Sequence, residues 1–233
     1  MKTLFTPKLF IVFTFCLTCV LSSANAQFGV KLNYLQANAE QWVITGPGST
    51  TEAPGQGWSA GVDYWFRLPT ARIEFTPELN YAVQKIQVVD GPELKTEWYS
   101  FFFNTNIYLL DLLNDCDCPT FSKQNDFFAK GFFIQVSPGL SMPSFKNALS
   151  SGSSDRQNGD LHFSLGGGLG FDFGVSDFLT FSPIVQLRYF PEVNWQNSFP
   201  DEGLDSSYSI QDPKSSLLQW TAGLRIGIRL DSF

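Results

Sequence analysis

The single histidine of the chain, His162, stands two residues before Ser164. An imidazole at this spacing could take the proton of a serine hydroxyl and make it a nucleophile for acyl transfer, provided that a carboxylate orients the ring. No Asp or Glu occupies an obvious partner position on the neighbouring segment. We therefore expect His162 and Ser164 to be structural residues, and the sequence predicts no catalytic site.

A second candidate is Cys116-Asp117-Cys118. In an oxidising compartment the two thiols are expected to form a disulfide, although a single intervening residue strains such a bond. A metal site formed with Asp115 is the alternative, but these three residues are too few, because a structural zinc ion is bound by four ligands. The acidic stretch DEGLD (201–205) lacks the regular ligand spacing of a calcium loop. The sequence therefore predicts no metal and no cofactor.

These residues belong to a chain with strong period-two alternation. In LHFSLGGGLGFDFG (161–174), odd positions hold Leu, Phe or Gly, and even positions hold His, Ser, Gly or Asp. Successive side chains of a strand point to opposite faces, so this segment predicts a strand with one apolar and one polar face. Seven further segments alternate in the same way: 28–34, 57–68, 72–84, 98–110, 131–142, 178–190 and 217–230. The sequence thus predicts eight strands.

The first 26 residues have the anatomy of a cleaved signal peptide. Lys2 and Lys8 precede or flank the apolar run 9–21, and Ala24-Asn25-Ala26 matches the small-x-small pattern of a cleavage site. We expect a signal peptide over 1–26 and one domain over 27–233. Loss of two lysines changes the balance from 15 to 13 basic residues against 22 acidic ones, or −9. Such a charge opposes binding to nucleic acid.

The links between the strands favour a membrane barrel. The short links 69–71 and 175–177 alternate with long polar stretches at 39–56, 142–160 and 194–216, and the long link 111–129 is the one departure. Outer-membrane barrels have short periplasmic turns, longer outer loops and an even strand number. A soluble sandwich or lipocalin-like barrel is the alternative. In such a fold the water-facing file, that is, the row of side chains on the polar face of each strand, would be rich in Lys and Glu. Here that file holds mostly Gly, Ser, Thr, Asn and Gln, and 24 Phe, 7 Tyr and 6 Trp need an apolar surrounding.

Charges of both signs fall on the polar file, which we expect to face the interior. The basic and acidic members are Lys31, Arg67, Arg72, Arg188, Arg225 and Arg229, and Asp63, Glu74, Glu78 and Asp172. An eight-stranded barrel is just wide enough for side chains to fill it. We expect Glu74 and Glu78 to pair with arginines of the last two strands. The inward glycines 166, 168 and 170 leave room for Trp65 or an arginine to lie across the lumen.

Five segments of the chain carry a resemblance to a known family: the signal peptide, the opening strand FGVKLNY (28–34), the later strands GWSAGVDYWFRL (57–68) and EFTPELNY (74–81), and the final GLRIGIRL (223–230). In these features the mature chain resembles the outer-membrane β-barrel family of Bacteroidota, which includes the PorT-like proteins. The resemblance implies insertion by the barrel assembly machinery and a link to secretion or envelope functions. Phe233 is out of phase with the outward file, whereas Leu230 is in phase.

The sequence therefore predicts an all-β fold, an eight-stranded antiparallel transmembrane up-and-down β-barrel with long extracellular loops, located in the cell outer membrane. The expected function is structural, accessory or partner-binding, and not enzymatic. The alternatives are a lipid A-modifying enzyme, which His162 and Ser164 would serve, and a narrow pore. Expected partners are outer-membrane lipid and lipopolysaccharide, the barrel assembly machinery, and an envelope or secretion-system protein, but no nucleic acid.

Overall fold

The computed structural model describes residues 27–46, 49–68, 71–87, 93–111, 131–147, 156–176, 178–194, 209–210 and 214–229. Most of these residues lie in strands. The strands are β1 (Gln27–Gly46), β2 (Ser49–Arg67), β3 (Ile73–Gln87), β4 (Glu93–Ile107), β5 (Phe132–Asn147), β6 (Arg156–Asn158), β7 (His162–Phe171), β8 (Phe173–Ser176), β9 (Leu179–Asn194), β10 (Ser209–Ile210) and β11 (Lys214–Arg229). A short 3-10 helix, η1 (Leu109–Asp111), follows β4. None of the helices in these ranges has the length and hydrophobicity that crossing a membrane requires.

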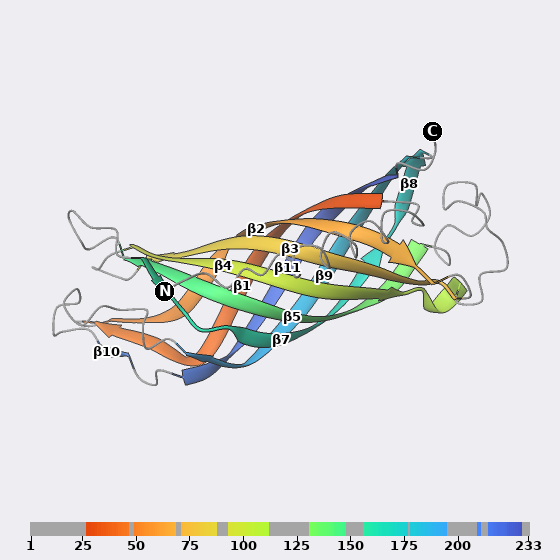
Figure 1. The fold of residues 1–233 in the computed structure, drawn as a ribbon. Helices are drawn as coiled ribbons and strands as arrows, with labels where there is room; N and C mark the ends of the chain where they lie inside the picture. The colour runs from red at the N-terminus through yellow and green to blue at the C-terminus, as the bar shows by residue number, and fades with distance from the viewer. Residues whose placement is uncertain are drawn as a thin grey trace, which may run out of the picture.

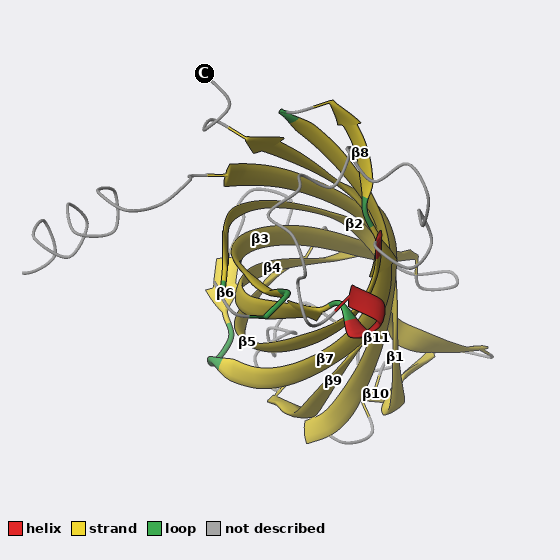
Figure 2. Cartoon of the chain, turned by 90° about the vertical axis from the view of Figure 1, so that its right-hand side faces the viewer, coloured by secondary structure: helices red, strands yellow, loops and turns green. Residues whose placement is uncertain are grey.

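The strands close into a barrel (Figure 1). Neighbours pair antiparallel in the order β1, β2, β3, β4, β5, β7, β9 and β11, and β11 pairs with β1 again. β8 continues the path of β7 beyond Asp172 and pairs with β9, while β6 and β10 add short pairings to β5 and β1. Figure 2 looks along the barrel and shows the strands forming a ring. Within the described ranges, the predicted eight-stranded antiparallel barrel is confirmed.

Burial follows the predicted alternation. On β7, Ser164 and Gly166 are buried, whereas Leu165 and Leu169 are 50% and 53% exposed. An exposed apolar file and a buried polar file recur on β1, where Leu32 is 59% exposed and Lys31 is 3% exposed. The polar residues therefore form the interior of this barrel, and the apolar residues form its outer surface.

The two ends of the barrel differ. One end holds Gln27, the link between β2 and β3, and the link between β8 and β9; we call it the turn end. At the other end β1 and β2 continue as a paired two-stranded extension, joined by β10, and we call this the ribbon end (Figure 1).

The stretch 39–56 was predicted to be a loop, and this is wrong. β1 continues to Gly46 and β2 starts at Ser49, with a register shift between Asn38 and Val43. The stretch is rich in β-branched residues on both sides of the turn, which favour a pleated strand, and pairing satisfies its backbone groups. β5 and β9 likewise continue to Asn147 and Asn194. The remaining predicted loop positions, 148–155 and 195–208, lie outside the described residues.

On the outer surface, an apolar band is bordered on each side by a belt of aromatic side chains. Toward the ribbon end, Tyr34 contacts Trp58 and Trp220 with ring centroids 5.4 and 5.7 Å apart, and Tyr81 contacts Tyr99 at 5.3 Å. Toward the turn end the aromatic residues are mainly phenylalanines: Phe28, Phe66, Phe75 and Phe103, together with Tyr64. On β2 the band extends from Trp58 to Phe66, close to the length of strand that crosses an outer membrane.

Candidate functional site: the filled lumen

A buried ion pair lies near the middle of the lumen. Lys31 on β1 donates to Glu78 on β3 at 3.4 Å, and the two side chains are 3% and 1% exposed. Asn80 donates to the other oxygen of Glu78 at 2.8 Å, and Asn104 also donates to this carboxylate at 2.8 Å. Glu78 is therefore surrounded by donors, as a buried carboxylate requires.

A second buried ion pair lies closer to the turn end. The guanidinium of Arg225 on β11 donates twice to Asp63 on β2, from Nη2 at 2.6 Å and from Nε at 2.8 Å. This two-point geometry is the strong form of an arginine–carboxylate contact. Because β1 lies between β11 and β2, the pair crosses a whole strand inside the barrel.

Each ion pair passes over a glycine of the strand that it crosses. A Cβ on Gly29 of β1 would lie 2.6 Å from Arg225 and Asp63. A Cβ on Gly61 of β2 would lie 2.5 Å from Glu78. The absence of side chains at Gly29 and Gly61 therefore gives the crossing charges the space that they occupy.

Arg188 on β9 is held without a carboxylate in direct contact among the described residues. It donates from Nη1 to the Ser137 carbonyl and to Ser164 Oγ, both at 3.1 Å, and from Nη2 to Ser137 Oγ at 2.7 Å. Its guanidinium carbon lies 3.5 Å from the centre of the Phe102 ring. A Cβ on Gly166 would lie 3.2 Å from Nη2, so an arginine does lie against one of the inward glycines, as predicted.

At the turn end, the interior is closed by aromatic rings and carboxylates. The Tyr108 hydroxyl bonds to Glu74 at 2.9 Å and to Asp172, and Trp65 Nε1 donates to Glu74 at 2.6 Å. Trp65 was expected to lie against the glycines of β7, but it turns to Glu74. The Phe133 ring occupies the space over Gly170 instead, because that glycine leaves room for a ring.

Apolar side chains fill the interior toward the ribbon end. Trp98 and Phe190 contact one another with ring centroids 5.4 Å apart, and Trp98 Nε1 donates to Gln84 at 2.7 Å. Further buried apolar residues here are Leu35, Ala37, Val193 and Leu217. This apolar part of the interior was not predicted from the sequence. The signal was present, because Trp98, Phe102 and Phe190 share the inward parity of their strands.

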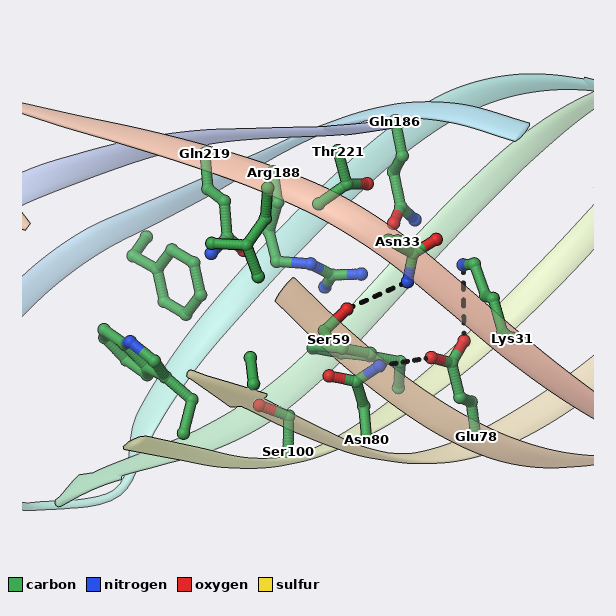
Figure 3. Close-up of a pocket in the computed structure, with 15 residues that line it drawn as sticks. Lys31, Asn33, Ser59, Glu78, Asn80, Ser100, Gln186, Arg188, Gln219 and Thr221 are labelled. Atoms are coloured by element: carbon green, nitrogen blue, oxygen red, sulfur yellow. Dashed lines mark hydrogen bonds and ion pairs between the residues drawn. The ribbon is translucent and has the colours of Figure 1, made fainter. Parts of the chain in front are cut away.

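Little space remains between these groups. The cavity shown in Figure 3 has a volume of about 20 Å³, enough for about one water molecule. Lys31, Glu78, Arg188 and Gln219 point into it from four different strands (Figure 3). In the described part of the chain, the lumen is a packed polar and aromatic interior.

Two ion pairs form in the described part of the lumen, with partners other than those predicted. Glu78 pairs with Lys31, and Arg225 pairs with Asp63, so each pair reaches over one strand and does not cross the full bore. Glu74 bonds to Trp65 and Tyr108. Arg67, predicted to face the interior, is exposed because it is the last residue of β2 at the turn end. The Arg229 side chain lies outside the described part of the chain.

His162 and Ser164 do not form a hydrogen-bonded pair. Among the described residues, no partner lies within hydrogen-bonding distance of His162 Nε2. Ser164 Oγ accepts from Arg188 and donates to the Gly139 carbonyl at 3.4 Å. The two side chains are thus buried in the wall of the lumen without the geometry that activates a serine.

Several predicted features lie outside the described residues: 1–26, Asp115, Cys116, Cys118, the stretch 201–205, Leu230 and Phe233. In the described ranges, no three His, Cys, Asp or Glu residues come together as a metal site.

Comparison with known proteins supports the barrel fold. No family model and no curated protein matches the chain. Among solved structures, the chain is similar to Neisserial surface protein A, with 9% identity, a TM-score of 0.50, and coverage of 89% of this chain and 98% of that one. Ail of Yersinia pestis (11% identity, TM-score 0.42, 87% and 99% covered) and OprG of Pseudomonas aeruginosa (12%, 0.39, 88% and 96%) also match. The last two likenesses are weaker. At these identities the similarity concerns the fold alone, which is that of eight-stranded outer-membrane barrels.

Proposed function

We propose that the protein is an integral protein of a bacterial outer membrane, with its turn end in the periplasm and its ribbon end at the cell surface. The apolar band between the two aromatic belts supports the membrane setting, because Tyr, Trp and Phe at the membrane interfaces border the lipid-facing surface of such barrels. The orientation is supported by the short β2–β3 and β8–β9 links at the turn end, since periplasmic turns are the short ones; the long β4–β5 link is the exception at this end.

The function proposed within that setting is structural or partner-binding, and the filled lumen is the observation that carries it. Among the described residues, the cavity between Lys31, Glu78 and Arg188 has a volume of only about 20 Å³, and buried ion pairs and aromatic side chains occupy the interior around it. The ribbon of β1 and β2 beyond Asn38 extends past the aromatic belt near the ribbon end. We therefore place partner contacts at the ribbon end and assign the lumen the role of a rigid support.

Two measurements test this function. Cell fractionation should recover the protein with outer-membrane markers, and the purified protein in planar bilayers should show no ion conductance. The matched control is a variant that empties the lumen, Arg188→Gly with Trp98→Ala. Steady conductance of the wild type would replace the structural role with that of a narrow channel.

A lipid-modifying activity is the competing function, and it depends on His162. We expect His162→Ala to leave the acyl and phosphate content of lipid A unchanged, as judged by mass spectrometry of lipid A from expressing cells. Ser141→Ala, which alters a buried lumen hydroxyl on β5 paired in register with His162, serves as the control. A change in lipid A on expression of the wild type that is lost only in His162→Ala would establish the enzyme.

Membership in the PorT-like family and the signal peptide over 1–26 belong to the same proposal. The small-x-small pattern Ala24-Asn25-Ala26 places the expected cleavage site directly before Gln27. Amino-terminal sequencing of the protein from isolated membranes should therefore read from Gln27, and a chain that still carries Met1 would contradict the cleavage.

A further inference from the structure

The hydroxyl group of Tyr108 lies between two carboxyl groups at the turn end of the lumen. Tyr108 follows β4, Glu74 belongs to β3, and Asp172 lies between β7 and β8. The Tyr108 oxygen is 2.9 Å from Glu74 Oε2 and within hydrogen-bonding distance of Asp172 Oδ2. Tyr108 is fully buried, and Glu74 is 8% exposed. One hydroxyl group therefore joins side chains from both sides of β5.

The number of hydrogen atoms at this contact is limited. A tyrosine hydroxyl has one hydrogen, and an ionised carboxylate only accepts hydrogen bonds. If both carboxyl groups were ionised, Tyr108 could donate to only one of them, and the other would face the hydroxyl oxygen with no hydrogen between the two atoms. Trp65 Nε1 donates to Glu74 at 2.6 Å, and Ser182 donates to the other oxygen of Asp172 at 2.5 Å, but neither supplies a hydrogen to this contact. Both contacts of Tyr108 are hydrogen bonds only when one carboxyl group carries a proton.

The charged groups at this end lead to the same conclusion. Among the described side chains, three carboxyl and two guanidinium groups come together here: Asp63, Glu74 and Asp172, with Arg72 and Arg225. Arg225 donates twice to Asp63. Arg72, whose guanidinium carbon is 4.1 Å from the centre of the Tyr108 ring, is left to balance the other two carboxyl groups. The neighbouring side chains from β5 and β9, Phe133 and Ser182, carry no charge. One carboxyl group is thus in excess, and an uncompensated buried charge is costly.

We propose that Glu74 and Asp172 bind one proton between them, through Tyr108, at neutral pH, and that this proton holds the turn end of the lumen closed. In one arrangement Glu74 donates to the Tyr108 oxygen and Tyr108 donates to Asp172; in the other, both hydrogen bonds are reversed. Release of the proton leaves two ionised groups with one donor, so the contact between β3 and the β7–β8 connection is lost as the pH rises. This proton site goes beyond the structural role proposed above, and it requires neither a partner nor a particular orientation.

Infrared spectroscopy of the full-length mature protein, in a detergent without carbonyl groups, tests the proton directly. The carbonyl stretch of a protonated carboxylic acid is separate from the bands of amides and of carboxylates. We expect one such band at neutral pH, and we expect Glu74→Gln and Asp172→Asn each to abolish it, because the carboxyl group that remains accepts from Tyr108 and stays ionised. Both variants should fold, since a carboxamide has the shape of a protonated acid. Glu192→Gln is the matched control, because Glu192 is an exposed carboxylate of the ribbon end, and it should keep the band.

The pH dependence of unfolding in urea gives a second measurement. Carboxyl groups of an unfolded chain ionise at about pH 4, so at neutral pH the folded protein holds a proton that unfolding releases, and stability falls as the pH rises. Relative to Asp172→Asn, the unfolding equilibrium constant of the wild type should rise by up to about tenfold per pH unit until the folded site itself loses the proton. Groups common to both proteins, such as His162, cancel in this comparison.

Three results would each overturn the proton site: a wild type without the acid band, a band that survives in either Glu74→Gln or Asp172→Asn, or parallel pH profiles for the wild type and Asp172→Asn. None of them bears on the outer-membrane setting, which fractionation and conductance test separately.

Discussion

Arg225 and Asp63 join strands β11 and β2 by two short hydrogen bonds that pass directly over Gly29 of the strand between them. The pair is possible in this form only because Gly29 presents no Cβ toward the lumen. A glycine and two charges from three different strands therefore act as one unit of packing.

Replacement of Gly29 should disturb that unit. Gly29→Ala places a Cβ 2.6 Å from both charged groups, so the pair has to shift, and overpacking of this kind typically costs about 1 to 3 kcal/mol. The urea unfolding midpoint in lipid vesicles measures the loss. Gly167→Ala is the control, because a Cβ there meets nothing within 4 Å. Equal midpoints for the two variants would show that Gly29 is not needed for the pair.

Removal of one member of the pair should cost more than removal of both. Arg225→Met or Asp63→Leu alone leaves a buried charge without its partner, which commonly costs about 3 to 5 kcal/mol. The double variant leaves no such charge and should unfold at a higher urea concentration than either single variant. Additive losses in this double-mutant cycle would contradict a direct interaction.

Replacement of Arg188 by lysine should destabilise the barrel. The guanidinium makes three hydrogen bonds to Ser137 and Ser164 and lies over the Phe102 ring, and a single ammonium group cannot satisfy all of these. We expect Arg188→Lys to lower the free energy of unfolding by about 2 to 3 kcal/mol. Arg67→Lys, at an exposed position of the turn end, should change it by less than about 0.5 kcal/mol.

A charge on the outward file should hinder insertion. Leu169 and Val185 are opposite one another on β7 and β9 and are 53% and 60% exposed. Arginine near the midplane of a barrel costs about 2 to 4 kcal/mol, so Leu169→Arg should lower the folding yield in lipid vesicles. Lys214→Arg is the control, because Lys214 lies at the ribbon end, beyond the aromatic belt, and the variant should fold like the wild type. Equal yields in lipid and in detergent-free buffer for the wild type would indicate a soluble barrel instead.

Thiol labelling tests the orientation of the barrel. In a background with Cys116→Ser and Cys118→Ser, an impermeant maleimide on intact cells should label Glu192→Cys at the ribbon end but not Leu110→Cys at the turn end. Both positions are 64% exposed, so accessibility in the isolated protein does not distinguish them. Labelling of Leu110→Cys alone would invert the proposed orientation.

The sequence by itself determined the eight strands of the barrel, the face on which most of their side chains lie and the closure of the sheet, but not the extension of β1 and β2 beyond Asn38 or the exposed position of Arg67. Alternation with a period of two is local information: it places Lys31, Glu78 and Leu169 on their faces without reference to any other strand. The sequence also indicated that the inward charges would be neutralised, because an isolated charge in a narrow lumen is too costly.

Tertiary structure alone decided which groups meet. Pairing depends on the register between strands far apart in the chain, so Arg225 could be matched with Asp63, and Lys31 with Glu78, only when the β1–β2 and β1–β11 ladders were in place. Alternation fixes the face of a residue, whereas the closure of the sheet fixes its neighbours, because a shift of register by two residues keeps every side chain on its face and changes all its partners.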